Sequence, residues 1–211
     1  MRKTTIRLLA ILLPLAAWAG PDAQHRRHPP GGGQGHRRAW ESPERERWQK
    51  PEEVLRLLKI EPEEVIADIG AGTGYFTRRF ARQAAKVYAV DVDEASLKQI
   101  ATQGFDNVEI IVAAPDDPKL PSASVDTIFF SNVLHHIDER PAYYAKLARA
   151  LKPGGRIVII DFHKRELPVG PPVSMKLAEE EVIAELEAAG FVREASYDLL
   201  PYQYFLVFRP R

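Results

Sequence analysis

Short apolar runs alternate with amphipathic stretches through most of the chain. The apolar runs are rich in Val and Ile and predict five strands, at residues 65–69, 86–91, 108–113, 125–130 and 156–161. The amphipathic stretches predict helices that begin near Pro51 or cover residues 74–85, 94–103 and 141–151. Apolar strands separated by helices require a parallel sheet that is covered on both faces.

The C-terminal part of the chain follows a different pattern. Residues 178–189 predict another helix, and residues 191–199 and 202–208 predict two strands joined by a short turn near Pro201. A short turn cannot connect parallel neighbours, so these two strands should be antiparallel.

The first predicted strand runs into the turn DIGAGTG, in which an acid precedes three glycines at every second position. Ligands of open α/β sheets bind beyond the carboxyl ends of the strands, and glycines there let the backbone approach a ligand closely. No lysine follows the last glycine, as a phosphate-binding P-loop would need. Tyr75 or Thr77 stands where a dinucleotide-binding loop needs its third glycine.

The acid of this turn, Asp68, favours a ligand without phosphate. A carboxylate repels a pyrophosphate but attracts a cationic amino-acid group. S-adenosylmethionine (SAM) carries an ammonium and a sulfonium, and it has no phosphate. Asp91, at the end of the second strand, is placed to accept hydrogen bonds from a ribose diol, while Asp93 is expected to cap the next helix. Asp116, after the third strand, is either an acceptor for the adenine amino group or a turn acid among prolines.

Four segments, in this order, resemble the class I SAM-dependent methyltransferases of the small-molecule type: DIGAGTG, VYAVDVDEASL, DDPKLPSASVDTIFFSNVLHHI and LKPGGRIVIID. The resemblance covers roughly residues 51–162. It implies an α/β fold of three layers (α/β/α) around a Rossmann-like, doubly wound seven-stranded sheet. The implied strand order is 3-2-1-4-5-7-6 with strand 7 antiparallel, which agrees with the antiparallel pair expected above.

The resemblance also implies roles for residues that match the family's motifs. Asp68 and the glycine loop would hold the methionine end of SAM, and Asp91 would bind the ribose hydroxyls. Asp116 would reach the adenine beside the backbone of Asp117, and Asn132 would lie near the methyl group. The expected cofactor-binding residues are Asp68, Gly70, Ala71, Gly72, Thr73, Gly74, Asp91, Val92, Asp116, Asp117 and Asn132.

Methyl transfer from a sulfonium is an in-line displacement, so the protein mainly aligns the reactants in a desolvated site. A base assists when the attacking atom carries a proton. His135 and His136 follow the fourth strand and are the candidate catalytic residues, because histidine titrates near neutrality. A simpler explanation of the pair is that one histidine packs against the sheet while the other caps or faces solvent. Asp161 has a similar alternative, as a hydrogen-bond acceptor that orders the loop after it. No metal site is expected, because His135 and Asp161 would need a third ligand such as His163.

Composition and charge exclude several functions. The chain has no cysteine, which rules out disulfides, Cys-ligated zinc and thiol catalysis. It has 29 basic and 29 acidic residues, so it lacks the electrostatic footprint of a nucleic-acid-binding protein. FFSNVLHH stands where DNA and protein-amide methylases have Asn/Asp-Pro-Pro-Tyr/Phe. A small-molecule methyl acceptor is therefore expected.

The first residues of the chain predict export. A basic lead, an apolar run and the sequence Ala17-Trp18-Ala19 are typical of a signal peptide over residues 1–19, and the run is shorter than the ~20 residues of a membrane span. Residues 20–39 predict a disordered Pro/Gly/His/Arg-rich linker before a single domain of residues 40–211. We expect a periplasmic or secreted protein, with tethering by an uncleaved signal as the alternative.

Two other functions stay open at this point. One is a SAM-binding or interaction module without catalytic activity, and the other is a Rossmann-type NAD(P)-dependent oxidoreductase. The complete glycine turn and its acids argue against lost SAM binding, and the failed dinucleotide spacing argues against the oxidoreductase.

Overall fold

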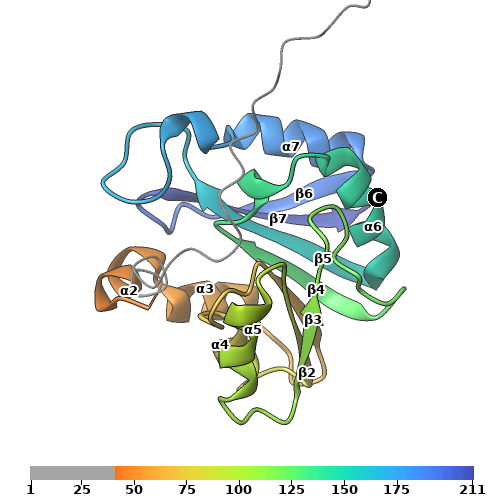
Figure 1. The fold of residues 1–211 in the computed structure, drawn as a ribbon. Coiled ribbons are helices and arrows are strands. Elements are labelled where there is room, and N and C mark those ends of the chain that lie inside the picture. Colours follow the sequence, from red (N-terminus) through yellow and green to blue (C-terminus); the bar gives the residue numbers. More distant parts are fainter. Residues whose placement is uncertain (1–40) are drawn as a thin grey trace, which may run out of the picture.

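The computed structural model describes residues 41–211, which build a seven-stranded sheet with helices on both faces (Figure 1). The strands are β1 (Val65–Ile69), β2 (Lys86–Asp91), β3 (Val108–Val112), β4 (Val125–Ser131), β5 (Leu151–Phe162), β6 (Phe191–Ser196) and β7 (Gln203–Pro210). Their order is β3-β2-β1-β4-β5-β7-β6; β1 to β5 are parallel, and β7 is antiparallel to both β5 and β6. The implied fold is therefore confirmed.

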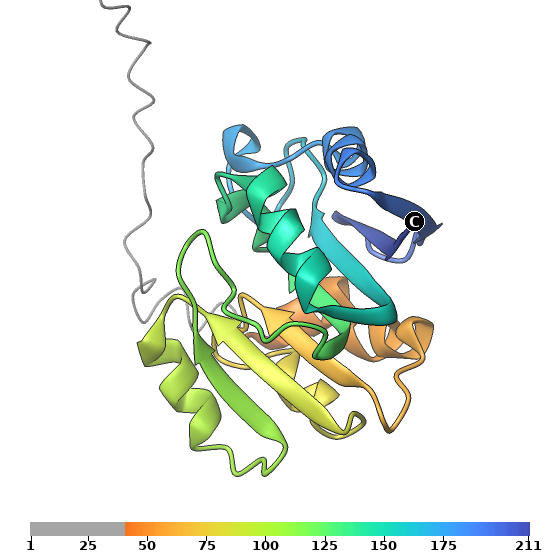
Figure 2. The ribbon, with the colours of Figure 1, turned by 90° about the vertical axis from the view of Figure 1, so that its right-hand side faces the viewer.

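The helices form the two outer layers. They are α2 (Pro43–Gln49), α3 (Pro51–Leu58), α4 (Thr77–Phe80), α5 (Glu94–Ala101), α6 (Arg140–Ala150) and α7 (Glu179–Ala188), with short 3-10 turns η1 (Leu134–His136) and η2 (Val173–Met175). Helices α6 and α7 cover one face, and α3, α4 and α5 cover the other (Figures 1 and 2). Strand residues alternate between the layers: Phe129 packs with α3 and α4, whereas Phe130 packs with α6.

The prediction of a helix over residues 74–85 is mostly wrong, because only four of these residues are α-helical. Gly74 has a φ of 92°, which no right-handed helix contains. The Arg79 guanidinium donates a hydrogen bond to the Tyr75 carbonyl at 2.6 Å, the carbonyl that the Arg79 backbone N–H would use in an α-helix. That N–H instead bonds Phe76, three residues back. The predicted apolar positions Phe76 and Phe80 are nevertheless buried.

The structure also contains a helix that was not predicted and a strand that begins earlier than predicted. Helix α2 was not predicted, because its sequence PERERWQ is dominated by charged residues and shows no apolar stripe. Strand β5 begins at Leu151 rather than Arg156: Val125 pairs with Leu151 but Thr127 pairs with Arg156, so the intervening residues bulge out of the ladder.

The predicted signal peptide and linker lie outside the described residues. Within residues 41–211, the longest apolar helices are too short to cross a membrane.

Candidate functional site

The glycine turn after β1 lies at the edge of the sheet where the parallel strands β1, β2, β4 and β5 all end. Gly70, Gly72 and Gly74 have φ angles of 72°, 54° and 92°, which other residues rarely adopt. A Cβ atom on Gly70 would lie 2.5 Å from Cγ2 of Val133, so the loop after β4 packs directly on this turn. The glycine turn and the loop after β4 therefore form one continuous surface at this edge, which we call the cradle.

Asp91 ties this turn to the end of β2. Its Oδ2 accepts a hydrogen bond from the Gly72 N–H at 2.8 Å, and its Oδ1 accepts one from the Asp93 N–H at 2.9 Å. Burial raises the pKa of the Asp91 carboxyl, while the two backbone donors act against that rise. A carboxylate has about four acceptor positions, so each oxygen can still accept from a ligand hydroxyl. Asp93 caps α5 as predicted, by accepting from the Ala95 N–H at 3.1 Å.

Asp68 is a buried acid directly beneath the turn, with 2% of its surface exposed. Its Oδ2 accepts a hydrogen bond from Thr77 Oγ1 at 2.6 Å. Burial raises the pKa of the Asp68 carboxyl to about 7; the Thr77 bond opposes this rise, and the charge of Asp91 adds to it. A buried acid with so raised a pKa is a candidate functional group, and a ligand cation beside it would favour its ionised form.

Helix α2 closes the same edge of the sheet and brings in residues that the sequence analysis missed. Arg45 and Gln49 are four residues apart on α2, a spacing that places both side chains on one face of the helix, and Glu41 lies two residues before the helix begins. Glu41 accepts hydrogen bonds from Thr73, in the glycine turn, and from Arg78. The four-residue spacing in ESPERERWQ could have indicated this helix, but the many charged residues around it indicated a solvent-exposed segment.

Arg45 is the most deeply buried charge of α2. Its guanidinium carbon lies 3.7 Å from the centroid of the Tyr75 ring, a cation–π arrangement. Burial lowers the pKa of Arg45 to about 10, although Tyr75, Glu41 and Asp68 all oppose that change. A positive group thus lies close to the buried acid at the floor of the cradle.

Three side-chain amides link α2, the loop after β4 and the start of β7. Asn132 Nδ2 donates to Gln49 Oε1 at 3.1 Å, Gln49 Nε2 donates to Gln203 Oε1 at 3.1 Å, and Gln203 Nε2 donates to Asn132 Oδ1. We call this closed ring the amide triangle. Asn132, predicted to lie near the methyl group, is at the expected edge, but its amide is engaged in the triangle. Gln49 and Gln203 were not predicted.

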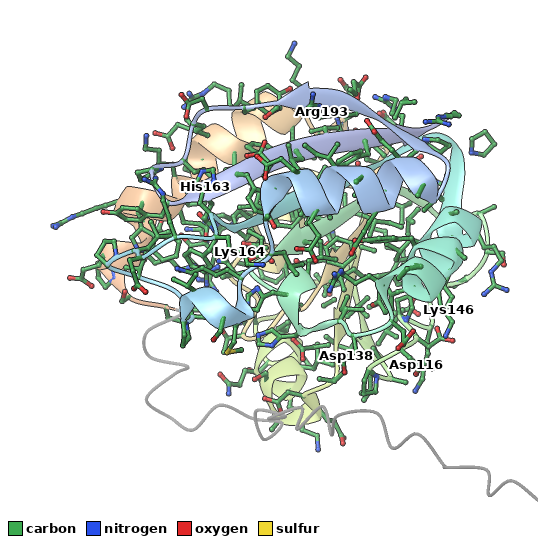
Figure 3. All side chains as sticks on the ribbon, turned by 90° about the horizontal axis from the view of Figure 1, so that it is seen from above. Asp116, Asp138, Lys146, His163, Lys164 and Arg193 are labelled. Carbon is green, nitrogen blue, oxygen red and sulfur yellow. The ribbon has the colours of Figure 1, made fainter. Side chains whose placement is uncertain are left out.

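The residues expected around the adenine are more open. Asp116 and Asp117 lie in the turn after β3. Figure 3 shows Asp116 beside Lys146 of α6. Lys146 Nζ donates to the Asp116 carbonyl at 2.6 Å and lies 3.2 Å from Asp117 Oδ2. The Asp116 side chain is 74% exposed, so both interpretations of this acid stay open. Val92 is 47% exposed next to Asp91 and presents an apolar surface at this edge.

The two histidines predicted after β4 differ in their surroundings. His135 Nδ1 lies 2.9 Å and 3.0 Å from the two carboxylate oxygens of Asp161, at the end of β5, and both side chains are buried. His136 is exposed at the surface, with its ring centroid 4.2 Å from that of His135. Asp161 therefore holds the imidazole of His135 in a fixed position, whereas His136 is open to solvent. Within residues 41–211, no three His, Asp or Glu side chains gather as a metal ion would require.

Comparison with known proteins agrees with this geometry. Residues 67–159 match a methyltransferase domain family. Demethylmenaquinone methyltransferase of Tropheryma whipplei is 34% identical over 56% of this chain and 50% of its own length, so the chain spans about half of that relative.

Two solved structures match over more of their own length. A SAM-dependent methyltransferase from Aquifex aeolicus superposes with a TM-score of 0.77 and 26% identity, over 84% of this chain and 98% of the other. A candidate type 11 methyltransferase from Sulfolobus solfataricus is 31% identical with a TM-score of 0.66, over 76% of this chain and 92% of the other. With its strand order and glycine turn, the chain belongs to the class I SAM-dependent methyltransferase family.

Proposed function

We propose that this protein transfers a methyl group from SAM to a small-molecule acceptor. One observation carries the proposal: the buried acid Asp68, the glycine turn and Asp91 lie at the same sheet edge as the His135–Asp161 pair. A cradle suited to a cationic ligand thus adjoins a histidine held by a carboxylate. Neither feature alone would indicate group transfer.

The residues of the cradle fit SAM in charge and in hydrogen-bonding capacity. Asp68 would hold the ammonium, and the backbone of the glycine turn would hold the rest of the methionine end. Asp91 would accept from the ribose hydroxyls, while the exposed side chain of Val92 offers an apolar surface for the adenine. Asp116 remains the proposed acceptor for the adenine amino group. Bound SAM supplies an electrophilic methyl group on its sulfonium.

The chain's own part in the chemistry is alignment and proton removal. If His135 donates its Nδ1–H to Asp161, the lone pair of the imidazole is left on Nε2. His135 would accept a proton there from an acceptor O–H, N–H or acidic C–H, and Asp161 would stabilise the resulting imidazolium. Burial of both side chains keeps water away from the transferred proton.

Binding and turnover of the full chain test the proposal in two steps. Isothermal titration should show binding of SAM and of S-adenosylhomocysteine, and a failure of both to bind at millimolar concentration would refute it. Incubation with methyl-labelled SAM and a metabolite extract should then transfer label to a small molecule. Binding without any transfer would instead support a catalytically silent SAM-binding module.

Export is a separate proposal that rests on residues 1–19 alone. The basic lead, the apolar run and the small-x-small pattern before Gly20 support cleavage after Ala19. Cell fractionation with N-terminal sequencing tests it: a mature chain that begins at Gly20 supports export, and an intact Met1 in a membrane fraction supports tethering instead.

A further inference from the structure

Lys176 is a buried lysine near the edge of the sheet that carries the proposed site. The residue is 3% exposed. Its Nζ donates a hydrogen bond to the Arg165 carbonyl at 2.8 Å and lies 5.9 Å from the centroid of the Phe162 ring. In the described part of the chain, no carboxylate oxygen lies within 4.0 Å of this ammonium.

Such an environment is unfavourable for a lysine. A buried ammonium is costly unless an opposite charge and hydrogen bonds replace its lost hydration. An ammonium has three donors, and a single described carbonyl accepts from this one. The nearest exposed lysine of the same segment, Lys164, instead lies 3.8 Å from Glu181 Oε2. Lys176 therefore has a binding capacity that the described residues do not use.

The position of Lys176 connects it to the proposed chemistry through Phe162. Phe162 directly follows Asp161, and its backbone N–H donates to the Asp161 carboxylate that holds His135. On one side the Phe162 ring packs against the ring of Trp48 in α2, with the two ring centroids 5.7 Å apart. On another, the backbone of Gly170 is so close that a Cβ would lie 2.8 Å from Phe162 Cε1.

Residues 163–178 thus fold back over the end of β5 and carry Lys176 with them. Figure 1 shows this segment and α2 at the left, beyond the same end of the strands, and Figure 3 labels its first residues, His163 and Lys164. The rings of Trp48 and Tyr202 are partly exposed beside it, with centroids 6.4 Å apart. An aromatic surface and a buried cation therefore lie together around Phe162, the residue that follows Asp161 at the end of β5.

We propose that Lys176 binds an anionic oxygen of the methyl acceptor, and that this acceptor is a planar aromatic molecule bearing a carboxylate. The inference rests on the proposed methyltransferase function. The carboxylate supplies the charge that Lys176 lacks, and the ring packs against Trp48 and Tyr202. Because Lys176 is buried within residues 163–178, binding requires its side chain to turn from the Arg165 carbonyl toward Trp48 and Tyr202.

Thermal stabilisation of the full chain by matched pairs of probes tests the proposal. Benzoate and 2-naphthoate, each beside its neutral amide, are added to the protein saturated with S-adenosylhomocysteine. The acids should stabilise the wild type more than the amides do. Lys176→Gln keeps a donor for the Arg165 carbonyl but removes the charge, and it should weaken binding of the acids by about 10- to 100-fold. Lys164→Gln should leave that binding unchanged.

The outcomes separate this inference from the proposed function. A wild type that fails to bind S-adenosylhomocysteine contradicts the methyltransferase function itself. A wild type that binds it but does not prefer acids over amides overturns the role of Lys176, as does a Lys176→Gln variant with wild-type affinity for the acids. If Lys176→Gln does not fold, Lys176→Met replaces it: loss of the preference for acids in a folded Met variant supports the ion pair, and retained preference opposes it.

Discussion

His135 Nδ1 lies within 3.0 Å of both carboxylate oxygens of Asp161, and the two side chains are 3% and 1% exposed. The pair joins the loop after β4 to the end of β5, so the position of the imidazole depends on two strands of the sheet. The Phe162 N–H donates to the same carboxylate at 2.8 Å and fixes its orientation. An imidazole held in this way has a defined tautomer, which a general base requires.

Substitution of the two histidines should separate them. His135→Ala should lower kcat by about 10²- to 10⁴-fold, the usual contribution of a general base, whereas His136→Ala should change it little. Asp161→Asn should also lower kcat, because an amide can present its NH2 group to Nδ1 and favour the wrong tautomer. Rates are measured at saturating SAM with the identified acceptor. Equal kcat values for the two alanine variants would end the general-base hypothesis.

The raised pKa of Asp68 predicts an unusual dependence of stability on pH. The carboxyl has a pKa of about 7 in the fold, against roughly 3.9 in an unfolded chain. Between these values the folded state binds more protons, so the contribution of Asp68 to stability falls as pH rises from about 4 to 7 and is constant above. The difference in Tm between wild type and Asp68→Asn should therefore change with pH over this range. Parallel profiles would show that Asp68 ionises normally.

The same acid should make SAM binding pH-dependent. The ammonium of SAM favours ionised Asp68, so binding below about pH 7 must remove a proton and affinity should weaken as pH falls. Titration calorimetry in buffers of different ionisation enthalpy would detect the released proton. Proton release that persists in Asp68→Asn would assign the effect to another group.

Removal of the charge of Asp91 should weaken SAM binding by about 1–3 kcal/mol, because hydrogen bonds to charged groups are the stronger ones. Asp91→Asn is the suitable change, since it keeps one acceptor for the Gly72 or Asp93 N–H. The matched control is Asp93→Asn, which removes a neighbouring charge at the cap of α5 and leaves the Asp91 carboxylate in place. Titration with SAM compares them, and unchanged affinity in a folded Asp91→Asn protein would remove Asp91 from the ribose role.

Two glycines with the same backbone angle test the close contact in the turn. Gly70 and Gly104 have φ angles of 72° and 73°, but a Cβ on Gly104 would meet no atom within 4 Å. Gly104→Ala should cost about 1–2 kcal/mol of unfolding free energy from backbone strain alone. Gly70→Ala should cost about 1–3 kcal/mol more, from overlap with Val133. Denaturant melts measure both, and addition of Val133→Ala should recover part of the second loss.

The amide triangle should contribute to the docking of α2. Gln49→Ala leaves Asn132 and Gln203 with unsatisfied groups and should cost about 1–3 kcal/mol of stability. Arg47→Ala, at an exposed position of the same helix, should cost little. Limited proteolysis would show whether α2 detaches, and equal cleavage rates in the two variants would mean that the triangle does not hold the helix.

The sequence by itself determined the sheet and the turn. Strands that are buried on both faces read as continuous apolar runs, and such a run is a local signal, so β1 and β2 have the predicted bounds. The glycine turn was equally readable, because positive φ angles at fixed positions demand glycine. Asp93 as a helix cap follows from chemistry within a few residues.

Only the tertiary structure decided how the edge of the sheet is closed. Gln49 is hydrogen-bonded to Asn132 and to Gln203, which lie 83 and 154 residues further along the chain. No local sequence pattern encodes such contacts. The shortening of the helix after Gly74 has the same origin, since Arg79 is held by Glu46 of α2 as well as by the Tyr75 carbonyl. Propensity and periodicity act over one or two turns, whereas the pairing of buried polar groups depends on which distant segments pack together. The sequence thus indicated where a ligand binds, and packing determined which side chains surround it.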